Sequence, residues 1–193
     1  MKRALVPLAE GFEEIEAVTI IDVLRRAGIE VVTAALGDLE VMGAHGIALG
    51  SDRRLDDIRG KDFDAIVLPG GGPGAKRLQQ DARILSLLRE QRAAGRLIAA
   101  ICAAPAALEA AGVIEGRRAT AYPGTRLASA QFSEDRVVVD CGLVTSRGPG
   151  TALEFALTLV VQLGQSEAAA KLRQDMLVQA VDVSSTEQQP SDR

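Results

Sequence analysis

Cys102 is the residue whose position in the sequence most suggests chemistry. It directly follows the apolar run Leu97–Ile101 and precedes Ala103–Ala111, a pattern typical of a strand, a tight turn and a helix. The small residues around it leave room for the sharp turn that presents a nucleophile above a sheet. A helix beginning there points unpaired backbone N–H groups at the sulfur, which predicts a lowered thiol pKa. A buried structural cysteine is the alternative, because unpaired cysteines are among the most buried residues.

A glycine-rich segment is the second candidate. Gly70–Gly74 reads GGGPG and follows the apolar run Asp64–Leu68. Such a loop can bring backbone N–H groups close to an oxyanion or a phosphate. It lacks the Lys-Ser/Thr of a phosphate-binding loop and does not fit the G-x-G-x-x-G spacing, so a plain turn is the alternative.

Three glutamates begin the first predicted helix. Glu13 and Glu14 are expected only to complement the helix dipole. Glu16 lies deeper in the helix, and if it faces the strand ends it is partly buried. Burial would raise the pKa of its carboxyl and fit it for proton transfer near neutral pH.

The remaining polar candidates favour structural roles. The segment Arg147–Thr151 reads RGPGT and either binds an anion or holds the structure, and we favour the structural role. Cys141 is expected to be an inert strand or turn residue. His45 lies on a predicted hairpin over Glu40–Leu49, so we expect a surface or interface residue rather than a catalytic base.

The elements that must position these residues alternate between short apolar runs and longer amphipathic stretches. This alternation predicts an α/β sandwich with a mostly parallel sheet, whose sites form at the carboxyl ends of the strands. A charged connector is expected at Asp52–Lys61, and a capping box at Thr151–Glu154. Strands are predicted at Arg3–Leu8, Glu30–Leu36, Asp64–Leu68, Leu97–Ile101, Arg118–Tyr122, Arg136–Asp140 and Leu143–Ser146, and helices at Glu13–Ala27, Ala82–Ala94, Ala103–Ala111, Ala152–Leu163 and Ser166–Ala180.

Length and composition argue against several classes of protein and of site. We expect one domain over residues 1–183 and a polar, disordered tail over residues 184–193. The 22 basic and 26 acidic residues are interspersed, which argues against a nucleic-acid partner. Two cysteines make no disulfide framework, and one histidine cannot supply a multi-histidine metal site. The sequence shows no secretory signal and no membrane-spanning apolar run, so a cytoplasmic location is expected.

Five motifs occur together and in order. They are AEGFEEIEA, DVLRRAGIEV, VLPGG, LIAAICAAPAAL and TSRGPGTALEFAL. In this order and spacing the sequence resembles the ThiJ/PfpI family, in particular the branch of the human parkinsonism-associated protein deglycase and the bacterial YajL-type proteins. The resemblance extends from about Lys2 to Ala180. It implies a flavodoxin-like three-layer α/β sandwich that usually forms a homodimer.

The resemblance also implies roles for individual residues. Cys102 matches the family's reactive, oxidation-sensitive cysteine, and Glu16 matches the acidic side chain that hydrogen-bonds its sulfur. Gly70, Gly71 and the backbone of Ala103 match an oxyanion-binding environment. No metal or cofactor is implied. The residues assigned to the pocket or to a dimer interface are Tyr122, His45, Arg25, Arg26, Arg147 and Pro149.

The implied activity is the cofactor-free conversion of methylglyoxal or glyoxal to hydroxy acids, or the repair of early glycation adducts, in protection against carbonyl and oxidative stress. The alternative is a redox sensor or chaperone whose cysteine is oxidised to a sulfinate, with little catalysis. A cysteine peptidase or amidotransferase is less favoured, because Tyr122 stands where members often carry the His that such chemistry needs. His45 stands where close relatives have Arg, which could make the pocket rim or interface respond to pH. No residue supports a biosynthetic role linked to thiamine, which the family label suggests.

Overall fold

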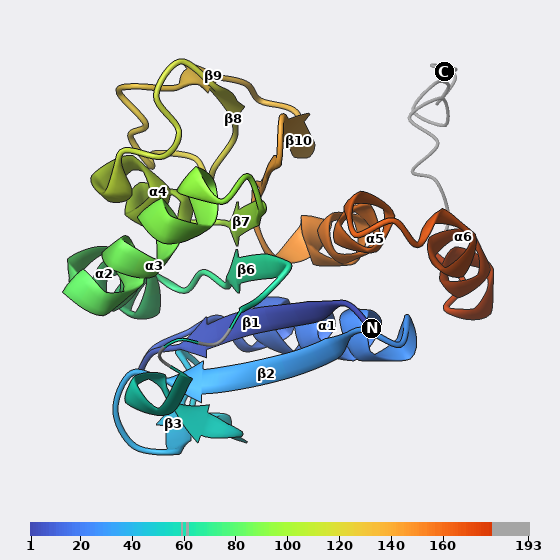
Figure 1. The fold of residues 1–193 in the computed structure, drawn as a ribbon, viewed down its shortest axis with the longest axis horizontal. Coiled ribbons are helices and arrows are strands. Elements are labelled where there is room, and N and C mark those ends of the chain that lie inside the picture. Colours follow the sequence, from blue (N-terminus) through green and yellow to red (C-terminus); the bar gives the residue numbers. More distant parts are fainter. Residues whose placement is uncertain (59, 61, 179–193) are drawn as a thin grey trace, which may run out of the picture.

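The computed structural model describes residues 1–58, 60 and 62–178, and its centre is a seven-stranded sheet (Figure 1). Every neighbouring pair of strands in this sheet is parallel except the pair at one edge, which is an antiparallel hairpin. The strand order is β10 (Val137–Asp140), β11 (Leu143–Ser146), β7 (Leu97–Ile101), β6 (Ala65–Leu68), β1 (Arg3–Leu8), β2 (Glu30–Ala35) and β5 (Arg53–Arg54).

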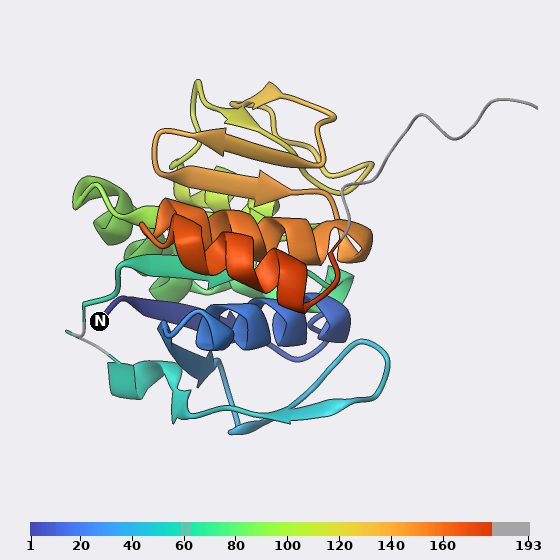
Figure 2. The same ribbon diagram turned by 90° about the vertical axis from the view of Figure 1, so that its right-hand side faces the viewer.

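Helices cover both faces of the sheet. One layer holds α1 (Glu14–Arg26), α5 (Ala152–Gln162) and α6 (Ser166–Asp175), which lie in front of the sheet in Figure 2. The other layer holds α2 (Gly72–Gln80), α3 (Ala82–Ala93) and α4 (Pro105–Ala111). The α/β sandwich with a mostly parallel sheet, predicted from the sequence, is confirmed.

Each layer packs on its own apolar cluster. Along β1, Val6 and Leu8 belong to the cluster under α1 and α5, whereas Leu5 belongs to the cluster under α2–α4. Alternate residues of a strand face opposite sides, and a strand buried on both faces must be apolar throughout. This explains why β6 and β7 read AIVL and LIAAI.

Two small sheets and two short 3-10 helices complete the described part. The antiparallel pair of β3 (Glu40–Met42) and β4 (Ala48–Gly50) confirms the hairpin predicted there. The second small sheet pairs β8 (Arg118–Ala119) with β9 (Gln131–Phe132) in parallel. The 3-10 helices cover Leu55–Ile58 and Pro149–Thr151.

Several predicted boundaries are wrong. The chain from Gly72 is already helical and not a loop to Gly74, because Pro73 is well suited to the first turn of a helix. The connector at Asp52–Lys61 contains β5 and a 3-10 helix, although Lys61 itself lies outside the described residues. The strand predicted at Arg118–Tyr122 pairs only over its first two residues. The last helix ends at Asp175.

The predicted capping box is also wrong. Thr151 precedes α5, but its hydroxyl makes no capping bond to that helix. Instead, Thr151 Oγ1 accepts from the Gly148 N–H at 3.1 Å and lies 2.6 Å from Ser146 Oγ. Glu154 accepts from Arg136 Nε at 2.9 Å rather than folding back on the helix end. These bonds fix the RGPGT segment to the end of β11.

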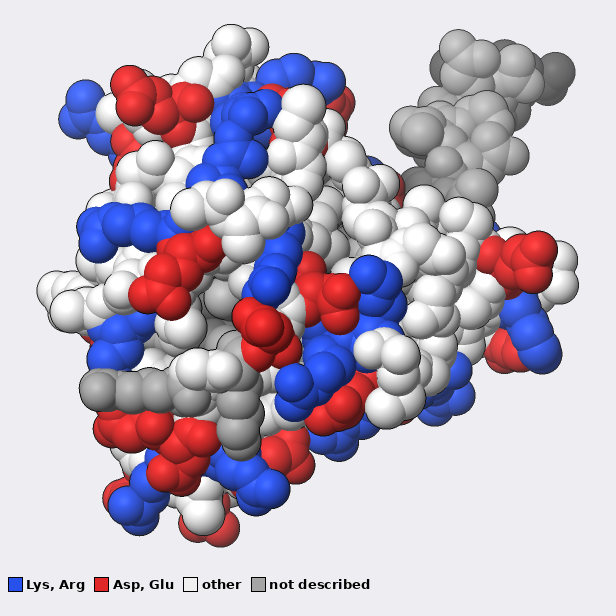
Figure 3. Space-filling model, viewed as in Figure 1, with Lys and Arg blue, Asp and Glu red and all other residues white. Residues whose placement is uncertain are grey.

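Three further predictions concern the surface charge, membrane-spanning helices and the end of the chain. In the view of Figure 3, acidic and basic side chains are interspersed, so this face carries no large field of one sign. Within the described ranges, no helix is long and apolar enough to cross a membrane. The tail predicted over residues 184–193 lies outside the described residues, and the single domain over residues 1–183 stays a prediction.

Candidate active site at Cys102

Cys102 occupies a strained turn at the carboxyl end of β7. Its φ is +62°, in the left-handed region that a residue with a Cβ adopts at a cost of about 1–3 kcal/mol. The backbone fixes this turn from two sides, because the Cys102 N–H donates to Ser146 O at 2.9 Å and its carbonyl accepts from the Tyr122 N–H at 2.8 Å. The residue is only 9% exposed. The turn therefore has the form predicted for a nucleophile.

The pKa of the Cys102 thiol is raised, not lowered as the sequence led us to expect. Burial and the charge of Glu16 together raise the pKa to about 12. The backbone N–H groups of Gly71 and Ala103 do hydrogen-bond to the sulfur and favour the thiolate, but they do not outweigh these effects.

Glu16 lies on the first turns of α1 and is completely buried. Burial raises the pKa of its carboxyl to about 7, while the hydrogen bonds that it accepts from the Gly70 N–H and from the Cys102 thiol act in the opposite direction. Its Oε2 accepts from the Gly70 N–H at 2.7 Å. Its Oε1 has no hydrogen-bond partner among the described residues. The structure thus brings together the carboxyl and the sulfur that the sequence singled out.

Glu16 and Cys102 titrate as a pair. Each pKa is raised above its ordinary value, so the pair retains one proton from about pH 7 to about pH 12. That proton resides either on the sulfur, facing a carboxylate, or on the carboxyl, facing a thiolate. The second arrangement supplies a nucleophile and an adjacent acid at the same time.

The backbone of the glycine-rich segment lies so close to neighbouring atoms that Gly70 and Gly71 leave no room for a side chain. A Cβ at Gly70 would lie 2.6 Å from Cys102 Cβ and 2.6 Å from Glu16 Oε2. Gly71 has φ +90° and packs against the backbone around Phe12, where a Cβ would collide. The Gly70 N–H is occupied by Glu16, so the oxyanion environment expected at Gly70 reduces to the N–H groups of Gly71 and Ala103.

Three other predicted residues, Tyr122, Arg147 and Pro149, lie on the two segments that follow the backbone partners of this turn or contain one of them. Tyr122 is half-exposed, and its amide, not its ring, holds Cys102. The ring lies next to Gly148, where a Cβ would stand 3.3 Å from Tyr122 Cδ2. Arg147 Nη1 donates to the Glu134 carbonyl at 3.0 Å, and Pro149 begins a 3-10 helix. The structural role favoured for this segment, and its place in a pocket or interface, stay predictions.

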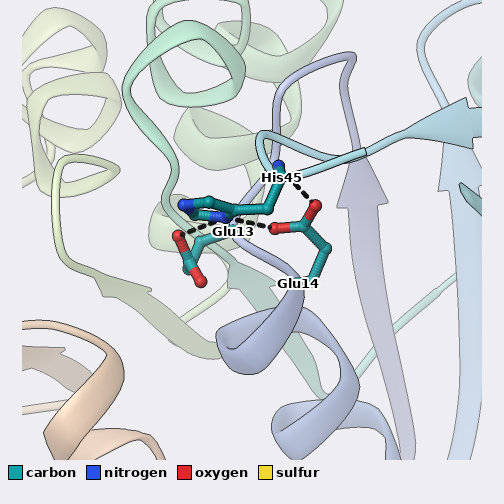
Figure 4. A group of neighbouring side chains, drawn as sticks. All are labelled: Glu13, Glu14 and His45. Atoms are coloured by element: carbon teal, nitrogen blue, oxygen red, sulfur yellow. Dashed lines mark hydrogen bonds and ion pairs between the residues drawn. The ribbon is translucent and has the colours of Figure 1, made fainter. Parts of the chain in front are cut away.

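Glu14 ties the β3–β4 hairpin to the start of α1 (Figure 4). Its Oε1 accepts from the His45 N–H at 2.6 Å, and its Oε2 lies 2.9 Å from His45 Nδ1. Burial opposes the charge of Glu14, but the hydrogen bonds from His45 and Ile47 lower its pKa to about 2. Glu14 and Glu13 raise the pKa of His45 in turn. The expectation that Glu13 and Glu14 only complement the helix dipole is therefore wrong.

Arg25 and Arg26 make local contacts on α1. Arg25 Nη2 donates to the Val31 carbonyl at 3.3 Å and to Asp52 at 3.2 Å. Arg26 pairs with Asp22, one turn earlier, at 2.7 Å. Both arginines are half-exposed, and neither contact involves the Cys102 turn. Their assignment to an interface stays a prediction.

Comparison with known proteins decides the family. A model of the DJ-1/PfpI family matches residues 2–162. The chain belongs to the DJ-1/PfpI family. The resemblance to the ThiJ/PfpI family inferred from the five motifs is thereby confirmed.

Named relatives in the family cover nearly all of this chain. Protein DJ-1 homolog B of Arabidopsis thaliana is 44% identical over 178 residues, which are 90% of this chain and 41% of that protein. The chain spans less than half the length of both Arabidopsis relatives, DJ-1 homologs A and B. Glutathione-independent glyoxalase DJR-1.2 of Caenorhabditis elegans is 38% identical, covering 89% of this chain and 94% of that protein. The crystal structure of Drosophila melanogaster DJ-1beta is 41% identical, with a TM-score of 0.90 over 93% of this chain and 99% of that one.

Within this DJ-1/PfpI chain, the contact between Glu14 and His45 was missed from the sequence. Glu14 and His45 are 31 residues apart, and the contact depends on how the hairpin folds back on α1. The available signal was a lone His in a hairpin and a Glu pair at a helix start, and neither pattern by itself predicts a contact.

Proposed function

We propose that this protein is a cofactor-independent glyoxalase or deglycase that acts on methylglyoxal, glyoxal or early glycation adducts through the Cys102 thiolate. The observation that carries this proposal is the buried Glu16 carboxyl, with its pKa raised to about 7, in contact with the sulfur at the strained turn. The C. elegans relative named as a glutathione-independent glyoxalase supports it. The biological role would be protection against carbonyl and oxidative stress.

The first step uses the proton shared by the pair. The Cys102 proton moves to Glu16, and the sulfur attacks the aldehyde carbon to form a C–S bond. The carbonyl π electrons move to the oxygen, which takes up a proton and completes a hemithioacetal. The N–H groups of Gly71 and Ala103, which face the sulfur, are placed to stabilise the oxyanion that forms beside it.

The second step moves hydrogen between adjacent carbons. Glu16, as carboxylate, takes the proton from the hemithioacetal carbon and gives an enediolate, then returns that proton to the neighbouring carbon. The hydroxyl proton of the first carbon passes to the neighbouring oxygen, which leaves a thioester. The first carbon is oxidised and the second is reduced, so no external oxidant is needed. Water then cleaves the resulting thioester, releasing the hydroxy acid and restoring the Cys102 thiol. The net reaction adds one water to one dicarbonyl.

A redox sensor or chaperone is the second candidate, and one observation favours it. Glu16 Oε1 is buried without a hydrogen-bond partner in the described residues, and a protonated Glu16 can donate to an oxygen added to the sulfur. Two equivalents of peroxide oxidise the thiolate to a sulfenate and then to a sulfinate, and each equivalent is reduced to water. The same pair would then stabilise an oxidised cysteine rather than turn over a substrate.

A peptidase or amidotransferase stays less favoured. Such chemistry needs an imidazole at the cysteine. The chain has one His, and its Nδ1 contacts Glu14 and Glu13.

We also propose a homodimer formed through the outer face of α1 and the β3–β4 hairpin. This face exposes apolar side chains, which a second copy would cover, and His45 lies beside it. The exposed apolar side chains are Ile15, Val18, Met42 and Ile47.

The test of the enzymatic proposal is the consumption of methylglyoxal by metal-free protein, with the hydroxy acid measured as product. Cys102→Ala is expected to abolish turnover, whereas Cys141→Ala, which removes the exposed second thiol, serves as the matched control and retains it. Full activity in Cys102→Ala would refute the proposal. A parent protein that forms the sulfinate at Cys102 under mild peroxide but turns over no dicarbonyl would establish the sensor instead.

A further inference from the structure

Glu13, Glu14 and His45 form a cluster that the proposed reaction does not use. Figure 4 shows the imidazole lying between the two carboxylates. His45 Nδ1 is 2.9 Å from Glu14 Oε2 and 3.6 Å from Glu13 Oε2. One ligand atom from each residue lies within 4.8 Å of the other two. Three groups of the types that bind transition metals therefore converge on one small volume.

The charge of this cluster is unbalanced. The side chains of Glu13 and Glu14 are 12% and 5% exposed, so two carboxylates are held largely out of water. Within residues 1–58, 60 and 62–178, neither carboxylate forms an ion pair with a Lys or Arg. The exposed imidazole is the one cationic partner they have there, and it is uncharged whenever it loses its proton. A divalent cation would balance both carboxylates whatever the state of His45.

The distances suit a tetrahedral zinc site. Zinc binds imidazole nitrogen and carboxylate oxygen at about 2.0–2.2 Å, which places the ligand atoms of a tetrahedron about 3.4 Å apart. The two separations from His45 Nδ1, 2.9 Å and 3.6 Å, lie on either side of that value. Small side-chain shifts therefore suffice to admit the ion. The imidazole is 68% exposed, so the solvent side leaves a fourth position for water.

The surrounding backbone holds the ligands in place. Glu14 Oε1 accepts from the N–H groups of His45 at 2.6 Å and Ile47 at 3.4 Å, which leaves Oε2 aimed at the imidazole. The Ala44 N–H donates to the Phe12 carbonyl at 2.8 Å, joining the hairpin to the start of α1. Gly43 has no side chain where the Glu14 carboxylate passes, and a Cβ there would collide with it. Hydrogen-bonded ligands of this kind are typical of metal sites.

We propose that Glu13, Glu14 and His45 bind one zinc-like divalent cation, with a water molecule as the fourth ligand. An imidazole ligand favours zinc over magnesium or calcium, which prefer oxygen alone. On binding, the Nδ1–H bond breaks, its proton passes to solvent, and a bond from Nδ1 to the ion forms in its place. The ion would join the hairpin to α1 and would bind neither Cys102 nor Glu16.

Calorimetric titration with zinc chloride tests this proposal. The protein should carry Cys102→Ser and Cys141→Ser, so that no thiol binds the metal, and should first be dialysed against a chelator. We expect one ion per chain. His45→Ala and Glu13→Gln should each weaken zinc binding by about 100-fold. The loss of a residue that only hydrogen-bonds a metal ligand already weakens binding by up to about that factor. Glu40→Gln, an exposed change on the same hairpin, is the matched control and should bind zinc like the parent.

A second measurement uses the unaltered chain. Crystals soaked in zinc chloride should show an anomalous peak between the three side chains, and magnesium chloride should not displace it. Unfolding curves of each variant separate a lost ligand from a lost fold. The proposal is overturned if the double serine protein binds no zinc, if His45→Ala binds as tightly as its parent, or if the anomalous signal lies only at Cys102.

Discussion

The Glu16 carboxylate raises the pKa of the Cys102 thiol that it contacts, whereas the hydrogen bond from that thiol lowers the pKa of Glu16, and burial raises both. The charge on Glu16 is one of the two main causes that raise the Cys102 pKa to about 12. A reactive cysteine at this turn therefore does not ionise alone. It becomes a thiolate when Glu16 holds the proton of the pair.

The pH dependence of turnover follows from this pair. The pair loses its first proton near pH 7 and its second near pH 12. The active form has one proton, so kcat/KM should rise as pH increases through about 7 and then stay level to well above pH 9. A pH–rate profile with methylglyoxal measures this. A rate that falls between pH 6 and pH 8 would contradict the shared proton.

Gly70 should tolerate no side chain. In Gly70→Ala the new Cβ would meet Cys102 Cβ and Glu16 Oε2 at 2.6 Å each, and the Ile101 carbonyl at 2.9 Å. We expect a loss of about 1–3 kcal/mol in the free energy of unfolding and a large fall in kcat. Gly72→Ala is the control, because nothing lies within 4 Å of its Cβ position. Urea unfolding and methylglyoxal turnover of both variants measure this effect. Equal stability and equal kcat in the two variants would show that the short distances at Gly70 are unimportant.

Replacing Glu14 should loosen the hairpin. Glu14→Gln removes the charge that two backbone N–H groups and His45 hydrogen-bond, and should cost about 1–3 kcal/mol of unfolding free energy. The folded pKa of about 2 is below the ordinary value of 4.5, so this contribution is complete above pH 4.5 and lost as pH falls toward 2. Urea unfolding with Glu40→Gln as the control measures it. A difference in unfolding free energy between parent and Glu14→Gln that is unchanged at pH 2 would refute the role of the Glu14 charge.

His45 should show the opposite pH dependence. Its pKa is raised above 6.5 by Glu14 and Glu13, so its charge stabilises the folded state fully below pH 6.5. That contribution is lost as pH rises through the raised pKa. With chelator present, the difference in unfolding free energy between the parent and His45→Ala should shrink from pH 6 to pH 9. A difference that grows over this range would mean that the ion pair with Glu14 and Glu13 is not the cause.

The sequence was most informative where a signal is local. The apolar run before Cys102, its small neighbours and the following helix lie within a few residues of each other, so the turn could be predicted from them. The alternation of elements likewise predicted the sheet. The burial of Glu16 was predicted only for a side chain that faces the strand ends, and Glu16, in the first turn of α1, is buried. Each of these features depends on residue spacing along a single segment.

Prediction was wrong where distant segments meet. The Cys102 pKa is raised by burial and by the charge of Glu16, which lies on α1, far away in the sequence. The Glu14–His45 contact joins residues 31 apart. Thr151 begins a capping-box sequence, but its hydroxyl hydrogen-bonds with Gly148 and Ser146 instead of capping α5. In each case a tertiary contact competed with, or overrode, a local preference.

The most direct test of the account is to titrate the Cys102 thiolate by ultraviolet absorbance in a Cys141→Ser background, with and without Glu16→Gln, and to measure methylglyoxal turnover on the same samples. Removing the carboxylate charge should lower the thiol pKa from about 12 toward its ordinary value of 9.0. Turnover should nevertheless fall by about 100-fold or more, because glutamine cannot carry the proton between the two carbons. An unchanged thiol pKa together with retained turnover would contradict the claim that Glu16 and Cys102 work as one proton-sharing pair.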